Sequence, residues 1–130
     1  MLTLMRVGWG KENPAFRQLF TSQMIPGGTK EQADWFNELQ RMTVSGEVAA
    51  RMHEASGEFD VTALLPQVSV PTLVLHARDE SRVPFEAGRR MAAGIPGAQF
   101  VTLPGRNHLF LENEPAFGQF LEHARAFLAT

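Results

Sequence analysis

Two short segments with the pattern of buried β-strands most constrain how this 130-residue chain can fold. Residues 70–77, VPTLVLHA, are almost wholly apolar and begin beside a proline, which is typical of a strand covered on both faces. Residues 98–104, AQFVTLP, have the same character, and a helical pattern over residues 84–93 separates the two segments. This order predicts a parallel pair with a right-handed crossover, and therefore an α/β fold.

A further helix is predicted over residues 115–129, because apolar residues recur there on one stripe. The stripe consists of Phe117, Phe120, Leu121, Ala124, Phe127 and Leu128. Two strands are few for a parallel sheet, and the apolar strand 70–77 has only one predicted partner. Because an open strand edge tends to pair with another chain, we expect self-association, most simply a two-fold dimer through strand 70–77.

Residues 1–66 have the pattern of helices separated by turns, and we expect this helical region to be followed by the α/β segment 67–130. Asn13-Pro14 predicts one helix start, and Thr29 with Gln32 forms a capping-box pattern for the next. Helical spacing predicts that the second of these helices turns an apolar face inward, made of Trp35, Phe36, Leu39 and Met42. A third helix, at about residues 45–55, should bury Val48, Ala49 and Met52.

Composition excludes several classes of function. The net charge is −2, with 12 basic and 14 acidic residues, so the basic patch that nucleic-acid binding needs is not expected. No apolar run reaches the roughly 20 residues that span a bilayer, and the first residues lack a signal-peptide pattern. The absence of cysteine excludes disulfides, thiolate metal sites and a cysteine nucleophile, and it fits a cytoplasmic protein.

Neither a metal nor a cofactor is expected. His76 with Asp79, and His108 with Glu112, are the pairs that would suggest a metal, but neither has the spacing of a closed zinc site. Glycines occur in turns, and none forms the loop between a strand and a helix that holds phosphates or dinucleotides.

Titratable side chains follow both predicted strands. Asp79 and Glu80 come directly after the first strand, and His108 comes after the second. Because ligands and catalytic groups of α/β folds gather at the carboxyl ends of parallel strands, these side chains should lie close together. A carboxylate beside a histidine fixes the imidazole tautomer and stabilises the imidazolium, so the pattern predicts an acid–base pair.

Residues 70–128 resemble the C-terminal end of an α/β-hydrolase, especially hydrolase modules joined to bacterial cyclase-like or helix-turn-helix regulators. The most specific features are His-Ala-Arg at the strand end, an acid before Val83-Pro84, and Gly-Arg-Asn-His ending at His108. Residues 1–66 resemble the helical lid of the same family. The resemblance implies a partial α/β-hydrolase fold, in which a helical lid is followed by strand–helix–strand–helix with two parallel strands.

The resemblance also implies roles for particular residues. His108 matches the catalytic histidine, and Glu80 matches the acid in its position relative to Pro84 and His108. Asp79 is the alternative acid and would need a one-residue slip in the loop. In a lid, Trp35, Phe36 and Met42 would line a site for a small apolar or ester-type ligand.

The family's nucleophile motif, Gly-x-Ser-x-Gly, does not occur in these residues. The serines are Ser22, Ser45, Ser56, Ser69 and Ser81, and none has glycine two positions before and after it. Three interpretations therefore stay open. The chain is a fragment or subunit of an ester- or acyl-type hydrolase whose serine comes from another chain, or a non-catalytic module that binds a ligand or protein, or a truncated hydrolase reading frame.

Overall fold

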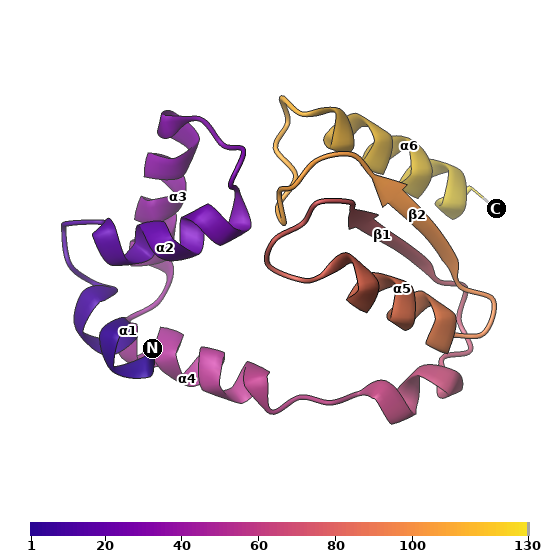
Figure 1. The fold of residues 1–130 in the computed structure, drawn as a ribbon, viewed down its shortest axis with the longest axis horizontal. Helices are drawn as coiled ribbons and strands as arrows, with labels where there is room; N and C mark the ends of the chain where they lie inside the picture. Colours follow the sequence, from indigo (N-terminus) through magenta and orange to yellow (C-terminus); the bar gives the residue numbers. More distant parts are fainter. Residues whose placement is uncertain (130) are drawn as a thin grey trace. The chain divides into compact units, whose positions relative to one another are not determined.

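The structure is a computed structural model that describes residues 1–129, in the element order α1–α4, a 3₁₀ helix (η1), β1, α5, β2 and α6 (Figure 1). The residues divide into a first unit, Met1–Asp60, and a second unit that begins at Val61. The first unit ends six residues before the expected boundary, because η1, Thr62–Gln67, packs against α5 of the second unit. Within the described residues, none of the helices has the length and apolar character that a membrane span requires.

The first unit consists of four helices: α1 (Leu2–Gly8), α2 (Ala15–Met24), α3 (Lys30–Thr43) and α4 (Gly46–Gly57). Its apolar core contains Met5, Trp9, Phe20, Ala49 and Ala50. The indole of Trp9 meets the ring of Phe20 edge-on, with 5.3 Å between ring centroids. Trp9 also donates a hydrogen bond from Nε1 to the carbonyl of Gln40, 3.0 Å away, so the core is tied to α3.

The predicted helix starts are present. Thr29 Oγ1 accepts a hydrogen bond from the backbone N–H of Gln32, and the Gln32 side chain accepts one from the N–H of Thr29, which is the complete capping box. Asn13 Oδ1 accepts from the N–H of Ala15 at 2.9 Å, so Asn13 supports the start of α2 while Pro14 is its N-cap residue.

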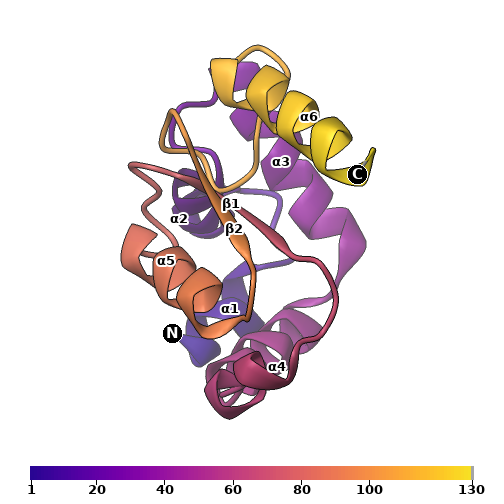
Figure 2. The same ribbon diagram turned by 90° about the vertical axis from the view of Figure 1, so that its right-hand side faces the viewer.

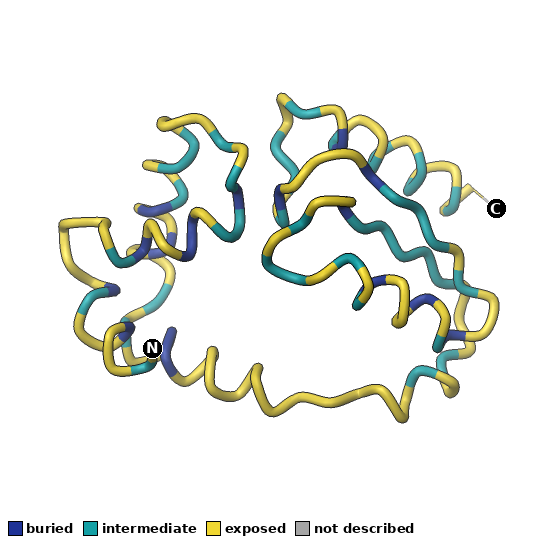
Figure 3. The backbone as a smooth tube through the Cα atoms, viewed as in Figure 1, coloured by how far each residue is buried: buried dark blue, intermediate teal, exposed yellow. Residues whose placement is uncertain are grey.

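The predicted inward faces of α3 and α4 are wrong for most of their residues. On α3, Trp35 is 63% exposed and Met42 is 74% exposed, Leu39 is exposed and Phe36 is partly buried. On α4, Val48 and Met52 are exposed and only Ala49 is buried as predicted. Figure 3 shows the second half of α4 and the segment after it as one continuous exposed run, which covers residues 51–60.

Polar side chains occupy the seam between α2 and α3 and explain this difference. Arg17 is 1% exposed and donates hydrogen bonds to the carbonyls of Asn37, Trp9 and Lys11. The Asn37 side chain accepts from Thr21 Oγ1, which in turn accepts from Gln40 Nε2. Since α2 presents buried hydrogen-bonding groups, α3 turns its polar face towards α2 to satisfy them, and its apolar stripe is left outside.

The second unit contains the predicted strand–helix–strand–helix: β1 (Leu73–Ala77), α5 (Phe85–Gly94), β2 (Gln99–Leu103) and α6 (Pro115–Leu128). The strands are parallel, with Leu73 opposite Gln99 and Ala77 opposite Leu103. Figures 1 and 2 show α5 and α6 on opposite sides of the strand pair. In the described part of the chain β2 is the only strand that pairs with β1, so the other edge of β1 has no strand partner.

Candidate active site

The carboxyl ends of β1 and β2 hold the candidate site. Because the strands are parallel and end opposite each other, the segments that follow them leave from the same edge of the pair. Backbone hydrogen bonds continue beyond the strands, from the Arg78 N–H to the Leu103 carbonyl (2.9 Å) and from the Asp79 N–H to the Gly105 carbonyl (3.0 Å). The two loops that carry the predicted site residues are therefore tied together by main-chain bonds.

Glu80 and His108 face each other across these loops. Glu80 Oε2 lies 3.1 Å from His108 Nδ1, within hydrogen-bond distance. The Glu80 side chain is 5% exposed and the His108 side chain is 34% exposed, so the carboxylate is shielded while the imidazole is accessible. A carboxylate on Nδ1 places the proton on that nitrogen and leaves Nε2 as the basic atom.

The second oxygen of Glu80 is bound by the backbone. Oε1 accepts hydrogen bonds from the N–H of Arg82 (2.7 Å) and from the N–H of Val83 (2.8 Å). Burial raises the pKa of the Glu80 carboxyl, but the Val83 N–H, the His108 imidazole and the Arg82 N–H together hold that pKa below its ordinary value. Glu80 is therefore a carboxylate at neutral pH, as a group that stabilises an imidazolium must be.

His76 is a third titratable group beside Glu80. Its Nε2 lies 3.1 Å from the carbonyl oxygen of Val83 and 3.6 Å from Glu80 Oε2. From the sequence, His76 was a weak metal candidate and part of the His-Ala-Arg at the strand end, and no contact with Glu80 was predicted for it. A usable signal was present, since a histidine inside an otherwise apolar strand needs a hydrogen-bond partner when it is buried.

The loop that carries His108 is held by Glu114, a residue for which no role was predicted from the sequence. Glu114 Oε2 accepts from Asn107 Nδ2 (3.0 Å), and Glu114 Oε1 accepts from the N–H of Leu111 (2.6 Å). These contacts lie on both sides of His108 in the sequence. Gly105 begins the loop with a φ of 100°, a backbone conformation that favours glycine.

Asp79, the alternative acid, is placed differently. Asp79 is exposed, and among the described residues it forms no ion pair with His108. Its backbone N–H holds the Gly105 carbonyl, so Asp79 contributes to the join between the loops through its main chain. The structure thus brings Glu80, and not Asp79, against the histidine.

A small pocket of about 240 Å³ opens beside the pair. Polar groups of Glu80, His76 and His108 share its wall with apolar side chains. The complete lining is Leu75, His76, Ala77, Glu80, Val83, Asn107, His108 and Phe110. Across residues 1–129, no cluster of three or more histidine and acidic side chains is arranged to hold a metal ion.

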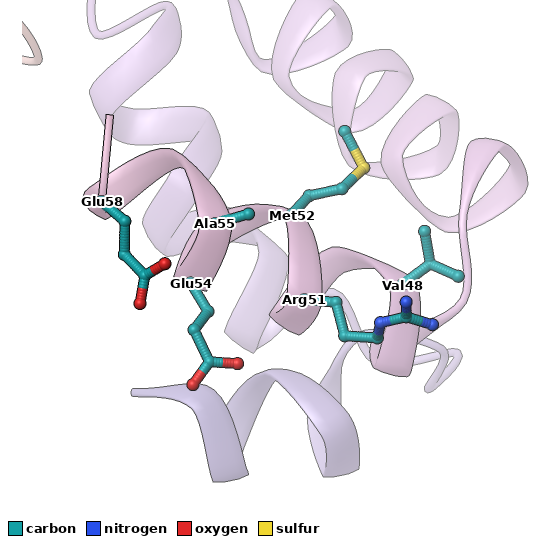
Figure 4. A pocket seen from close by; sticks show the side chains of 6 residues that line it. All are labelled: Val48, Arg51, Met52, Glu54, Ala55 and Glu58. Atoms are coloured by element: carbon teal, nitrogen blue, oxygen red, sulfur yellow. The ribbon is translucent and has the colours of Figure 1, made fainter. Parts of the chain in front are cut away.

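The predicted ligand-contacting residues Trp35, Phe36 and Met42 lie in the first unit and are not part of this pocket. The rings of Trp35 and Phe36 are neighbours, with centroids 6.4 Å apart. A larger hollow, of about 620 Å³, lies along α4. Figure 4 shows that its labelled side chains come from that helix and from Glu58, the residue that directly follows it. None of the predicted site residues borders the hollow. This hollow lacks a histidine–acid pair.

Comparison with known proteins connects this geometry with a known fold. No family model matches the chain. RutD of Pseudomonas syringae is 36% identical over 80 residues, which cover 62% of this chain and 30% of RutD. The non-heme chloroperoxidase CPO-A1 of Kitasatospora aureofaciens is 34% identical over 94 residues, which cover 68% of this chain and 33% of the chloroperoxidase. The chain thus spans about a third of the length of these curated relatives.

The likeness in structure extends over nearly the whole chain. The esterase EaEST of Exiguobacterium antarcticum superposes with a TM-score of 0.80 at 18% identity, and the match covers 99% of this chain and 47% of the esterase. At this identity the match shows the fold alone. It nevertheless includes both the helical first unit and the second unit that holds Glu80 and His108.

Proposed function

We propose that this chain, which has a partial α/β-hydrolase fold, supplies the histidine and the acid of a serine-type hydrolase site. The observation that carries the proposal is the 3.1 Å contact between His108 Nδ1 and a shielded Glu80 carboxylate at the carboxyl ends of adjacent parallel strands. His108 is the general base and Glu80 is the group that orients it. Asp79 is not proposed as the acid, because its side chain does not meet the imidazole.

In this proposal His108 Nε2 removes the proton from a nucleophilic hydroxyl and later delivers it to the leaving group. Glu80 stays ionised throughout and stabilises the imidazolium that forms between these two transfers. None of the five serines has the Gly-x-Ser-x-Gly surroundings of a nucleophile elbow. We therefore propose that the hydroxyl is provided by a polypeptide segment other than these residues.

Esters or related acyl compounds are the proposed substrates. One solved structure with this fold is described as an esterase, and the pocket beside His108 combines apolar walls with the proposed base. Trp35, Phe36 and Met42 are proposed to line the acyl or alcohol site when the complete hydrolase is assembled. The exposure of Trp35 and Met42 supports this role, because large apolar side chains at a surface commonly mark a binding face.

The test joins the chain to a serine-bearing segment. The part of the Exiguobacterium esterase that this chain does not match is fused ahead of residue 1, and p-nitrophenyl acetate hydrolysis is measured for the fusion and for the chain alone. We expect hydrolysis by the fusion and near-background rates for the chain alone. His108→Ala should lower kcat of the fusion about 10³-fold or more, and Glu80→Gln should also lower it strongly.

His123→Gln is the matched control, because His123 is a partly buried histidine of α6 outside the site, and kcat should be unchanged. A folded fusion that hydrolyses the ester equally well after His108→Ala would overturn the proposal. A folded fusion with no hydrolysis at all would favour the alternative, a non-catalytic module derived from a hydrolase.

We also propose that the isolated chain forms a two-fold dimer through the open edge of β1. An unpaired strand edge has N–H and C=O groups that another strand can satisfy, and β1 carries such an edge in the described residues. Sedimentation at micromolar concentration should show a dimer. A monodisperse monomer under these conditions would contradict this arrangement.

A further inference from the structure

We propose that His76 is a positioning residue for the Glu80–His108 pair, acting through the backbone of Val83. The catalytic meaning of this role rests on the proposed function, but the contact network itself does not. His76 is not a catalytic residue in this proposal, because it acts on the backbone turn that holds Glu80.

The backbone of Val83 connects the two side chains. Its N–H donates to Glu80 Oε1 at 2.8 Å, and its carbonyl oxygen lies 3.1 Å from His76 Nε2. Since the carbonyl can only accept, the proton of His76 must be on Nε2 for this hydrogen bond to form. The N–H and the carbonyl belong to two peptide planes joined at the Cα of Val83, so a hydrogen bond that fixes the carbonyl also limits how far the N–H can move away from Glu80.

His76 itself is rigidly placed. It lies within β1, opposite Thr102 of β2, and its side chain is 10% exposed. Its ring meets Phe85 edge-on at 5.7 Å between centroids. On the α5 side the imidazole lies against Gly88, where an added Cβ would come within 2.4 Å of Nδ1. The strand, Phe85 and Gly88 therefore direct Nε2 towards the turn.

The same nitrogen also lies beside the oxygen that contacts His108. His76 Nε2 is 3.6 Å from Glu80 Oε2, so this oxygen has N–H groups of two imidazoles nearby. A packing role alone would not need a nitrogen at this position, because β1 is otherwise apolar and an aromatic ring would fill the same space. The hydrogen bond to Val83 is the feature that a hydrocarbon ring cannot provide.

Nuclear magnetic resonance of the 130-residue chain tests this role without relying on enzyme activity. His76→Phe keeps a ring against Phe85 but removes the donor, and His76→Gln keeps an N–H donor at a similar reach. Val74→Ala is the matched control, because Val74 lies two positions away on the same face of β1 and loses packing only. The readouts are the carboxyl ¹³C titration of Glu80 and the Nδ1 proton resonance of His108.

In His76→Phe we expect the pKa of Glu80 to rise towards its ordinary value, because the Val83 N–H no longer holds Oε1 firmly. The Nδ1 proton of His108 should exchange faster and its resonance should broaden. His76→Gln should restore both signals, and Val74→Ala should leave both unchanged. In the esterase fusion, His76→Phe should lower kcat about tenfold with little change in KM.

Unchanged Glu80 and His108 signals in a folded His76→Phe chain would overturn the inference, even if its stability falls. Failure of His76→Gln to restore the signals would also count against it. The two proposals fail separately. A fusion that does not hydrolyse esters removes the proposed function, whereas the resonance changes in the isolated chain would still establish His76 as the residue that positions Glu80.

Discussion

The two units of the chain bury polar groups in opposite ways. In the first unit a buried cation, Arg17, is satisfied by main-chain carbonyls at the seam of two helices. In the second unit a shielded anion, Glu80, is satisfied by main-chain N–H groups at the end of a strand. The first arrangement leaves Arg17 inaccessible to solvent, while the second leaves an imidazole, His108, partly exposed beside the charge.

The contrast between Arg17 and Glu80 indicates which buried charges can belong to a reactive site. The Arg17 guanidinium donates hydrogen bonds to the carbonyl oxygens of Asn37, Trp9 and Lys11 in the same unit, so it joins loops and helices of the fold. One oxygen of Glu80 is bound by the turn and the other is directed at a group that can exchange protons. Burial of a charge therefore indicates a site only where a titratable neighbour stays accessible.

The largest effect is expected from breaking the polar seam of the first unit. Arg17→Met should lower the free energy of unfolding of this unit by about 3 kcal/mol or more, because several buried carbonyls lose their donors. Urea denaturation followed by tryptophan fluorescence measures it, since Trp9 and Trp35 both lie in the first unit. Arg41→Met is the control, because Arg41 is exposed and pairs with Glu38 at the surface, and it should change stability by less than about 1 kcal/mol. Equal effects of the two substitutions would remove the contrast between the units.

Glu80 should make the stability of the second unit depend on pH. Its pKa is lowered in the folded chain, so its contribution is complete above the pKa of an unfolded glutamate, about 4.3, and is lost as the pH falls through the lower folded value. Glu80→Gln should lower the free energy of unfolding at neutral pH by about 1–3 kcal/mol. It should also weaken the fall in stability that accompanies a decrease in pH below about 4.3. Amide hydrogen exchange in β1, measured between pH 3 and 7, tests this prediction.

Glu86→Gln is the control for this experiment, because Glu86 is an exposed residue of α5 paired with Arg89. It should leave the loss of stability at acidic pH as it is in the unsubstituted chain. If Glu80→Gln does not change the loss of stability at acidic pH, the turn does not hold the Glu80 carboxylate in solution.

Removing the contacts of Glu114 with the His108 loop should have a smaller effect on stability. Glu114→Ala removes the acceptor for Asn107 and for the Leu111 N–H and should reduce stability by about 1–2 kcal/mol. The resonances of His108 should broaden because the loop samples more conformations. Glu112→Ala, at an exposed position of the same loop, should leave them sharp. A sharp His108 signal in Glu114→Ala would assign the order of the loop to other contacts.

The smallest effect is expected at the exposed apolar face of α3. Trp35→Ser and Met42→Ser should each change the stability of the isolated chain by less than about 0.5 kcal/mol, because both side chains are largely exposed. Thermal denaturation followed by circular dichroism measures this. A loss of 2 kcal/mol or more, of the size that burial of an apolar side chain contributes, would show that the face is covered in solution.

The sequence predicted the second unit better than the first for a physical reason. A buried parallel strand is apolar on both faces, so β1 and β2 could be located within three residues at each end without knowing their neighbours. The inward face of α3 depends on Arg17, Thr21, Asn37 and Gln40, which find each other only in the folded chain. Helical periodicity cannot show that the polar side of a helix is the buried one.

The two facing side chains of the candidate site could be predicted from the sequence, but the groups that hold them in place could not. The resemblance to α/β-hydrolases selected Glu80 by its position relative to Pro84 and His108, and the structure places this residue against His108. The catalytic role of both residues stays a prediction. The backbone of Val83, His76 and Glu114 were not predicted to hold the site residues. Two backbone N–H groups leave no trace in the amino-acid letters, because any residue except proline supplies them.

The close approach of Gly88 to His76 has a consequence for how such sequences can vary. A side chain at position 88 and an imidazole at position 76 exclude each other, since a Cβ atom at position 88 would occupy the space of His76 Nδ1. Among sequences with this fold, the two positions are therefore expected to change together. A glycine at 88 should accompany histidine at 76, and chains that have lost the histidine are free to place alanine there and gain helix propensity in α5.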